Sequence, residues 1–172
     1  MSLLQDPIFI QALGFIGTIM VAFGMQQKSY NKVVFFKIAN EFASGVHYLL
    51  LGGITGMAVN FAACFANGVY WYRIRKGKSN TVFQIIFGIM FVAISLVSWH
   101  GWISIFVLIA KLLSSVSLGI NNTRVIRFFN LISTPCWLIY NIYMFSIPGM
   151  ISDIIVLTSV ILAIIRIDLL KK

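Results

Sequence analysis

Residues 81–99 read TVFQIIFGIMFVAISLVSW, without one charged side chain. A helix that crosses a bilayer needs about 20 consecutive, mostly apolar residues, so this stretch predicts a membrane-spanning helix. The rest of the chain has the same character, because 60% of its 172 residues are hydrophobic and only 10% are charged. Soluble domains carry roughly 25% charged residues. The composition therefore excludes a soluble globule, a coiled coil and a disordered chain, and it predicts an all-α integral membrane protein.

Six further apolar segments of similar length flank residues 81–99, so the sequence predicts seven spanning helices. Besides Thr81–Trp99, the predicted spans are Ile8–Gln26, Val33–Leu51, Ile54–Tyr72, Trp102–Ile120, Val125–Phe145 and Gly149–Ile167. The connections between them are short, so we expect consecutive helices to be antiparallel neighbours.

The basic residues predict the orientation, because 12 of the 13 Lys and Arg residues fall on one side of a seven-span chain. They are Lys28, Lys32, Lys37, Arg73, Arg75, Lys76, Lys78, Arg124, Arg127, Arg166, Lys171 and Lys172. Cytoplasmic loops carry the excess of Lys and Arg, so we expect the N-terminus outside and the C-terminus in the cytoplasm. The net charge of +9 then anchors this face to anionic lipid and does not call for nucleic acid. Lys37, at the end of its span, is expected to snorkel to the cytoplasmic surface.

A shift of 93 residues superposes the first three predicted spans on the last three. Ile54-Thr55-Gly56-Met57 meets Ile147-Pro148-Gly149-Met150, and seven of the 43 pairs from Val34 to Lys76 are identical. Both halves start outside, so the repeats are parallel, and residues 81–99 form the inverting helix between them. We therefore predict a 3+1+3 plan: a first three-helix bundle (1–78), a linker helix (79–100) and a second three-helix bundle (101–172).

Charged residues inside the apolar segments mark the candidate site. The chain has four acids, Asp6, Glu41, Asp153 and Asp168, of which Glu41 and Asp153 lie within spans, as does Lys111. A charge at the bilayer centre costs at least about 2.5–3.5 kcal/mol, so each is expected to face the bundle interior and a partner. The sequence leaves two alternatives for the partner of Lys111, Glu41 and Asp153. The pair has either a purely structural role or a role in solute or proton coupling.

Polar residues at helical spacing in several spans predict a polar cleft between the two bundles, because lipid does not solvate them. The candidate solute-binding residues are His47, Asn60, Trp137, Tyr140, Asn141 and Asp153. For His47, Trp137 and Tyr140 a structural role in hydrogen bonding or packing is the open alternative. No catalytic motif is present, and His47 and His100 lack any zinc-site spacing. We therefore expect no enzyme activity, no metal and no cofactor.

Two segments carry a resemblance to a known family. Gly45–Gly52 (GVHYLLLG) and Cys136–Asn141 (CWLIYN), followed by the acid Asp153, resemble the YgjV-type bacterial inner membrane proteins over essentially the whole chain. That family is grouped with the PQ-loop superfamily, which includes the SWEET and SemiSWEET sugar carriers and the KDEL receptor. The resemblance implies a bacterial inner (plasma) membrane location and a SWEET-like fold of seven transmembrane helices in two bundles.

The chain departs from that superfamily at two places. The Pro-Gln motif would fall at Met25-Gln26 or Gln26-Gln27, and neither pair has the proline. SWEET carriers bind sugar through an asparagine on the third helix of each bundle, where this chain has Asn60 and Asp153. A carboxylate there favours a cationic or proton-coupled solute over a neutral sugar.

The sequence and the resemblance together predict a small polar solute transporter that works by alternating access in the lipid bilayer, with proton coupling as an option. The alternative is a non-transporting membrane receptor or partner-binding protein of the same fold, in which the buried ion pair is structural. The short loops favour transport, because they offer little surface to a soluble partner. Exposed helix surface leaves room for a homodimer.

Overall fold

The computed structural model describes residues 7–99, 101–144 and 146–169, and all regular structure within these ranges is helical. Asp6, His100, Phe145, Lys171 and Lys172 lie outside the described residues. The helices are α1 (Pro7–Met25), α2 (Tyr30–Leu50), α3 (Ile54–Arg75), α4 (Thr81–Val97), α5 (Ser104–Leu118), α6 (Thr123–Tyr143) and α7 (Ile147–Ala163), and α7 continues as a π-helical segment, Ile164–Leu169. Each of the seven predicted spans therefore corresponds to one α-helix.

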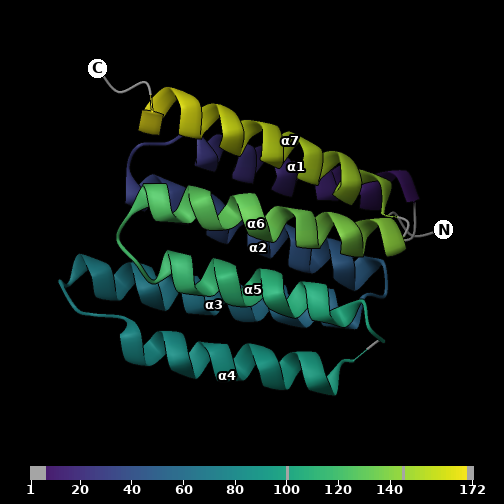
Figure 1. The fold of residues 1–172 in the computed structure, drawn as a ribbon. Coiled ribbons are helices and arrows are strands. Elements are labelled where there is room, and N and C mark those ends of the chain that lie inside the picture. The colour runs from purple at the N-terminus through teal and green to yellow at the C-terminus, as the bar shows by residue number, and fades with distance from the viewer. Residues whose placement is uncertain (1–6, 100, 145, 170–172) are drawn as a thin grey trace.

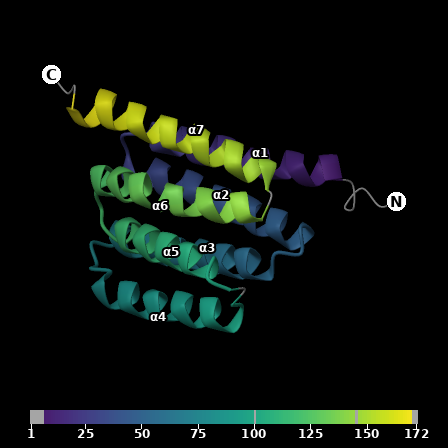
Figure 2. The same cartoon turned by 45° about the vertical axis from the view of Figure 1, so that its right-hand side comes forward.

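The helices lie in two layers (Figures 1 and 2). One layer contains α1, α2 and α3 in that order, and the other contains α7, α6 and α5. Across the layers α1 packs against α7 and α3 against α5, while α4 lies along one edge beside α3 and α5. Successive helices alternate in direction, so that α1 begins and α7 ends at opposite ends of the molecule (Figure 1).

The distribution of polar and apolar side chains is the reverse of that in a soluble protein. Large apolar residues are exposed on the outside, among them Val97 on α4 at 91% and Phe65 on α3 at 66%. Charged side chains are buried, with Glu41, Lys111 and Arg127 only 1–2% exposed. Water would not tolerate so much apolar surface, whereas lipid solvates it. The outer surface is therefore that of a membrane protein.

Two of the described helices are long and apolar enough to cross a membrane by length and composition alone: Ile8–Met25 of α1 and Ile147–Ile167 of α7 with its extension. Helices α4 and α5 are apolar but shorter. Helices α2, α3 and α6 have the length but carry the polar residues of the interior. Their polar faces therefore depend on neighbouring helices for partners.

The ends of α2 and α6, which are 93 residues apart, share one backbone hydrogen bond. Gly53 N donates to Tyr48 O at 2.8 Å, and Ser146 N donates to Asn141 O at 3.0 Å. The α2 end is a Schellman motif, because Gly52 has φ +75° and its N–H also bonds Leu49 O. Tyr48 and Asn141, which accept these bonds through their carbonyl groups, have their side chains in the space between the layers.

The glycines that follow these turns also match. A Cβ atom on Gly56 would lie 2.7 Å from the ring of Tyr48, and a Cβ atom on Gly149 would lie 2.5 Å from the side-chain amide of Asn141. Both glycines are therefore needed for α3 and α7 to approach the side chains that α2 and α6 send inward.

We predict that Gly56→Ala lowers the stability of the protein by about 1–3 kcal/mol, because the added methyl group collides with the buried Tyr48 ring. Gly68→Ala is the matched control on the same helix, since a Cβ there has open space around it. Thermal unfolding in detergent would show a lower midpoint for Gly56→Ala and an unchanged or higher one for Gly68→Ala. Equal midpoints for the two variants would contradict this account of the α2–α3 contact.

Candidate functional site

A polar cavity of about 90 Å³ lies between the two layers, with side chains from α1, α2, α3, α5, α6 and α7 in its wall. The lining residues are Gly14, Thr18, Val21, Lys37, Asn40, Glu41, Ser44, His47, Tyr48, Asn60, Lys111, Asn130, Thr134, Trp137, Asn141, Ser146, Gly149, Ser152, Asp153 and Val156. Most are polar, as the predicted cleft requires. A cavity of this size has room for a few water molecules or one small solute.

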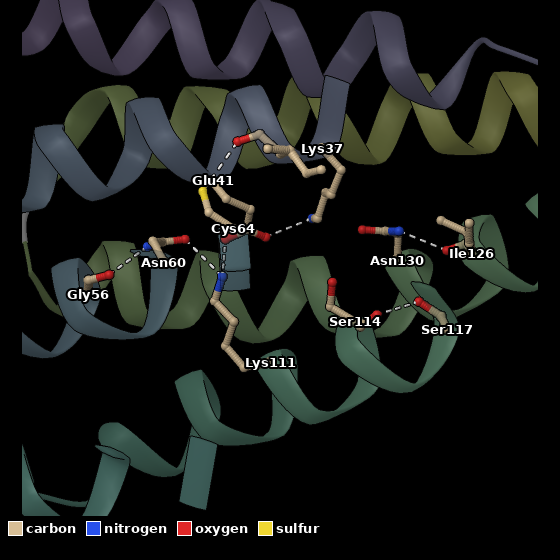
Figure 3. Close-up of polar contacts among 11 residues, drawn as sticks. Lys37, Glu41, Gly56, Asn60, Cys64, Lys111, Ser114, Ser117, Ile126 and Asn130 are labelled. Atoms are coloured by element: carbon tan, nitrogen blue, oxygen red, sulfur yellow. Dashed lines mark hydrogen bonds and ion pairs between the residues drawn. The ribbon is translucent and has the colours of Figure 1, made fainter. Parts of the chain in front are cut away.

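An ionic cluster forms one part of the wall. The ammonium of Lys111 on α5 forms a hydrogen-bonded ion pair with Glu41 on α2 and donates to Asn60 Oδ1 on α3 at 2.8 Å (Figure 3). Lys37 Nζ, one turn before Glu41, lies 3.7 Å from the other carboxylate oxygen. The pair therefore joins the two layers, and of the two partners left open for Lys111 the structure selects Glu41.

Burial makes this cluster energetically demanding. Glu41 and Lys111 are both 2% exposed, and isolated charges at such sites are strongly disfavoured unless paired and hydrogen-bonded. Asn60 supplies the additional bond to Lys111, and its own amide donates to Gly56 O at 2.7 Å. The orientation of Asn60 is fixed by these two contacts, so its carbonyl oxygen faces the cation.

Aromatic rings cover the cluster. Lys111 Nζ lies 5.2 Å from the ring centroid of Trp137, within cation–π range. Trp137 stacks on Tyr48, with centroids 6.3 Å apart and planes at 21°. Tyr140, also predicted as a solute-binding residue, is buried edge-on to both rings and does not line the cavity. Tyr140 therefore packs against the rings of Tyr48 and Trp137, which form the aromatic wall.

A second polar group surrounds Asp153 on α7. Asn141 Nδ2 donates to Asp153 Oδ2 at 2.8 Å, and the Tyr48 hydroxyl donates to Asn141 Oδ1 at 3.1 Å. The chain Tyr48–Asn141–Asp153 runs from one layer to the other. Within the part of the chain that the structure describes, Asp153 has no Lys or Arg partner. Its described hydrogen bond is thus the one from the Asn141 amide.

His47 presents an unused ring nitrogen. Its Nδ1 lies 2.8 Å from Ile10 O, and its Nε2 is buried without a hydrogen-bond partner. A carbonyl oxygen only accepts, so in the neutral ring Nδ1 carries the proton and Nε2 is a free acceptor. His47 is 4% exposed and lines the cavity. His47 therefore makes one hydrogen bond to α1 through Nδ1 and keeps Nε2 available as an acceptor.

The structure places five of the six predicted solute-binding residues on the cavity wall, namely His47, Asn60, Trp137, Asn141 and Asp153. One expectation was wrong: Lys37 does not snorkel to the surface but is 8% exposed and directed toward Glu41. The cost of burying Glu41 explains this, since a second cation nearby stabilises the carboxylate. Ser152, which contacts Thr18 across the layers, was missed because a lone serine in an apolar helix carries no sequence signal.

We predict that Lys111→Met destabilises the protein by about 3–5 kcal/mol, because Glu41 then keeps only the more distant Lys37. Adding Glu41→Gln to Lys111→Met should recover at least about 1 kcal/mol, since no buried carboxylate is left in need of the lost cation. A double-mutant cycle of unfolding midpoints measures this coupling. Strictly additive effects would show that the two side chains do not stabilise one another.

Comparison with known proteins places the chain in one group. The family model Imp-YgjV, described as Bacterial inner membrane protein, matches residues 8–171. No curated protein and no solved structure gives a match.

Proposed function

Because the chain belongs to the Imp-YgjV family of bacterial inner membrane proteins, we propose that it crosses that membrane seven times, with the N-terminus outside. The basic residues support this orientation. Lys28 and Lys32 at the start of α2, Lys76 and Lys78 after α3, and Arg124 at the start of α6 all fall at the end of the molecule where α7 ends (Figure 1). This end then faces the cytoplasm, where positive charge is retained.

A C-terminal fusion tests the orientation. We expect green fluorescent protein fused after residue 172 to fluoresce, and alkaline phosphatase at the same place to be inactive, because the former folds in the cytoplasm and the latter requires the periplasm. Fusions in the loop between α4 and α5 should give the opposite pair of results. Active phosphatase at the C-terminus would overturn the seven-span orientation.

We further propose that the chain is a 3+1+3 protein with the parallel repeats of SWEET-type carriers. The matched turns after α2 and α6 and the matched glycines Gly56 and Gly149 support it. So does the layer arrangement, because a half-turn about an axis along the helices superposes α1, α2 and α3 on α5, α6 and α7 (Figure 1). Helix α4 then reverses the chain between the two repeats.

The activity that we propose is transport of a small polar solute by alternating access, and the cavity between the layers is the observation that carries it. Six helices direct polar and charged side chains into it, although burial of such groups in a membrane is costly. Intramembrane ionisable residues commonly mark solute and proton pathways. A cavity at the interface of two repeats is also where carriers of this design hold their solute.

Hydrogen bonds between the layers lie toward both ends of the cavity, as an alternating mechanism needs. At the proposed cytoplasmic end the Tyr30 hydroxyl donates to Leu118 O at 2.6 Å and Arg127 Nη1 donates to Gln27 O at 3.1 Å. Toward the other end Tyr48 donates to Asn141. Rocking of one layer on the other would break one set and keep the other, so the cavity would open to one side at a time.

We predict that Asp153→Asn abolishes solute binding while the protein stays folded, since Asn keeps the shape of the side chain but removes the charge. A thermal-shift screen of purified protein with sugars, amino acids, polyamines, nucleosides and vitamin precursors measures this, because a bound solute raises stability by about 2.7 kcal/mol at one hundred times its dissociation constant. The control is Thr158→Val, since Thr158 is exposed on the same helix and bonds only Ile154 O.

A shift that persists in Asp153→Asn would remove Asp153 from the binding site. The absence of any shift, with Asp153→Asn strongly destabilised, would instead favour the receptor alternative, in which the buried charges hold the fold together.

A further inference from the structure

The charges on the cavity wall are balanced in sum but separated in position. Lys37 and Lys111 share one carboxylate, Glu41, so this cluster has one positive charge in excess. Asp153, whose described partner is the Asn141 amide, has one negative charge in excess. All four side chains line the same cavity. Within the described residues Lys37 and Asp153 form no direct ion pair, and charges of both signs facing one small space favour an occupant that carries both signs itself.

We infer that the solute is a small zwitterion, with its ammonium group at Asp153 and its carboxylate at Lys37. This assignment rests on the proposed function, since it names the chemical class of the solute that the proposed carrier binds. The cavity volume of about 90 Å³ limits the solute to a few heavy atoms, of the size of a short ω-amino acid.

The cavity wall offers the ammonium group two acceptors. Asp153 uses Oδ2 for Asn141, and its Oδ1 has no hydrogen bond within the described residues. His47 Nε2 is a buried acceptor without a hydrogen-bond partner, and it lies on the wall of the same cavity. An ammonium group has three N–H donors and no acceptor, so a wall with these unused acceptors suits it. A solute carboxylate would instead be repelled by Asp153.

The end that receives the carboxylate offers a cation with spare donors. Lys37 is 8% exposed, and its described contact is the 3.7 Å approach to Glu41, which is long for a hydrogen bond. Lys111, by contrast, is occupied by Glu41, Asn60 and the Trp137 ring. Figure 3 shows the Lys37 ammonium between the Glu41 carboxylate and the side chain of Asn130, on the far side of that carboxylate from Lys111. Lys37 is therefore the group that a solute carboxylate meets.

Solutes with a single charge, or with none, fit this wall less well. A neutral sugar would bring no counterion for Asp153 or for the excess positive charge of the Lys37–Glu41–Lys111 cluster, and a simple amine would bring none for that cluster. Each uncompensated buried charge disfavours the complex. The site therefore discriminates by the charge pattern of the solute more than by its shape.

Four compounds of equal chain length test the inference: 4-aminobutanoate (zwitterion), butanoate (anion), butan-1-amine (cation) and butanamide (neutral). Binding to the purified full-length protein is measured by isothermal titration calorimetry, together with β-alanine as a shorter zwitterion. We expect one or both zwitterions to bind, and the singly charged and neutral compounds to bind at least tenfold more weakly.

Variants separate the two ends of the site. Asp153→Asn should weaken the zwitterion at least tenfold and leave any residual butanoate binding unchanged, whereas Lys37→Met should weaken the zwitterion and leave any residual butan-1-amine binding unchanged. Thr158→Val, outside the cavity, should change neither. Unfolding midpoints of all three variants show whether each is folded before its binding is interpreted.

Three outcomes would overturn the inference. Binding of butanamide or of a sugar as tightly as 4-aminobutanoate would refute the zwitterion and leave the proposed carrier function standing. Equal loss of butanoate and butan-1-amine binding in Asp153→Asn would refute the assignment of the two ends. No binding by the four compounds, β-alanine or any solute of the thermal-shift screen would refute both the inference and the proposed function.

Discussion

The ion pair between Glu41 and Lys111 is the interaction on which the interior of this protein depends. It connects α2 in one layer to α5 in the other, and neither charge is accessible to solvent. In a medium of low dielectric constant such a pair is tolerated only when its remaining hydrogen-bonding groups are also satisfied. Asn60 and Trp137 complete the surroundings of the cation. The position of α3 and the orientation of the aromatic wall therefore follow from the need to accommodate one lysine.

The lipid environment explains how the remaining helices are used. Between apolar helices in lipid there is little hydrophobic driving force, so association relies on close packing and on hydrogen bonds between helices. Here α1 and α7 are joined by Thr18 with Ser152 and by Gln26 with Ser159, although both helices are otherwise strongly apolar. Helix α4 has a largely exposed apolar surface and lies at the edge. The polar residues are thus concentrated at the contacts between layers, where they also form the cavity.

The sequence was sufficient to predict the seven helices, because apolar length and charge pattern are properties of local segments. It was also sufficient to place Glu41 and Lys111 in the interior, since a charge in a spanning helix has few other places to go. It could not select Glu41 over Asp153 as the partner of Lys111, because that choice depends on which helices pack across the layers. The positions of Lys37 and Tyr140 were hidden for the same reason. Lys37 responds to the charge of Glu41, and Tyr140 lies behind Tyr48 and Trp137.

On the 3+1+3 plan that we propose, positions 93 residues apart correspond to one another, but their side chains differ, and this difference gives the cavity its character. Glu41 corresponds to Thr134, Asn60 to Asp153, and Thr18 to Lys111. In each pair one residue is ionisable and the other is neutral, so none of these three charges has a counterpart of its own sign at the matching position. Two repeats with identical linings would surround a solute with the same groups on both sides. Substitution of one member of each pair creates instead a wall with distinct ends, and only such a wall can recognise the direction in which an asymmetric solute lies. On the repeat that we propose, the shared backbone plan sets the size and position of the cavity, while the divergence of its side chains sets which solutes the proposed carrier can distinguish.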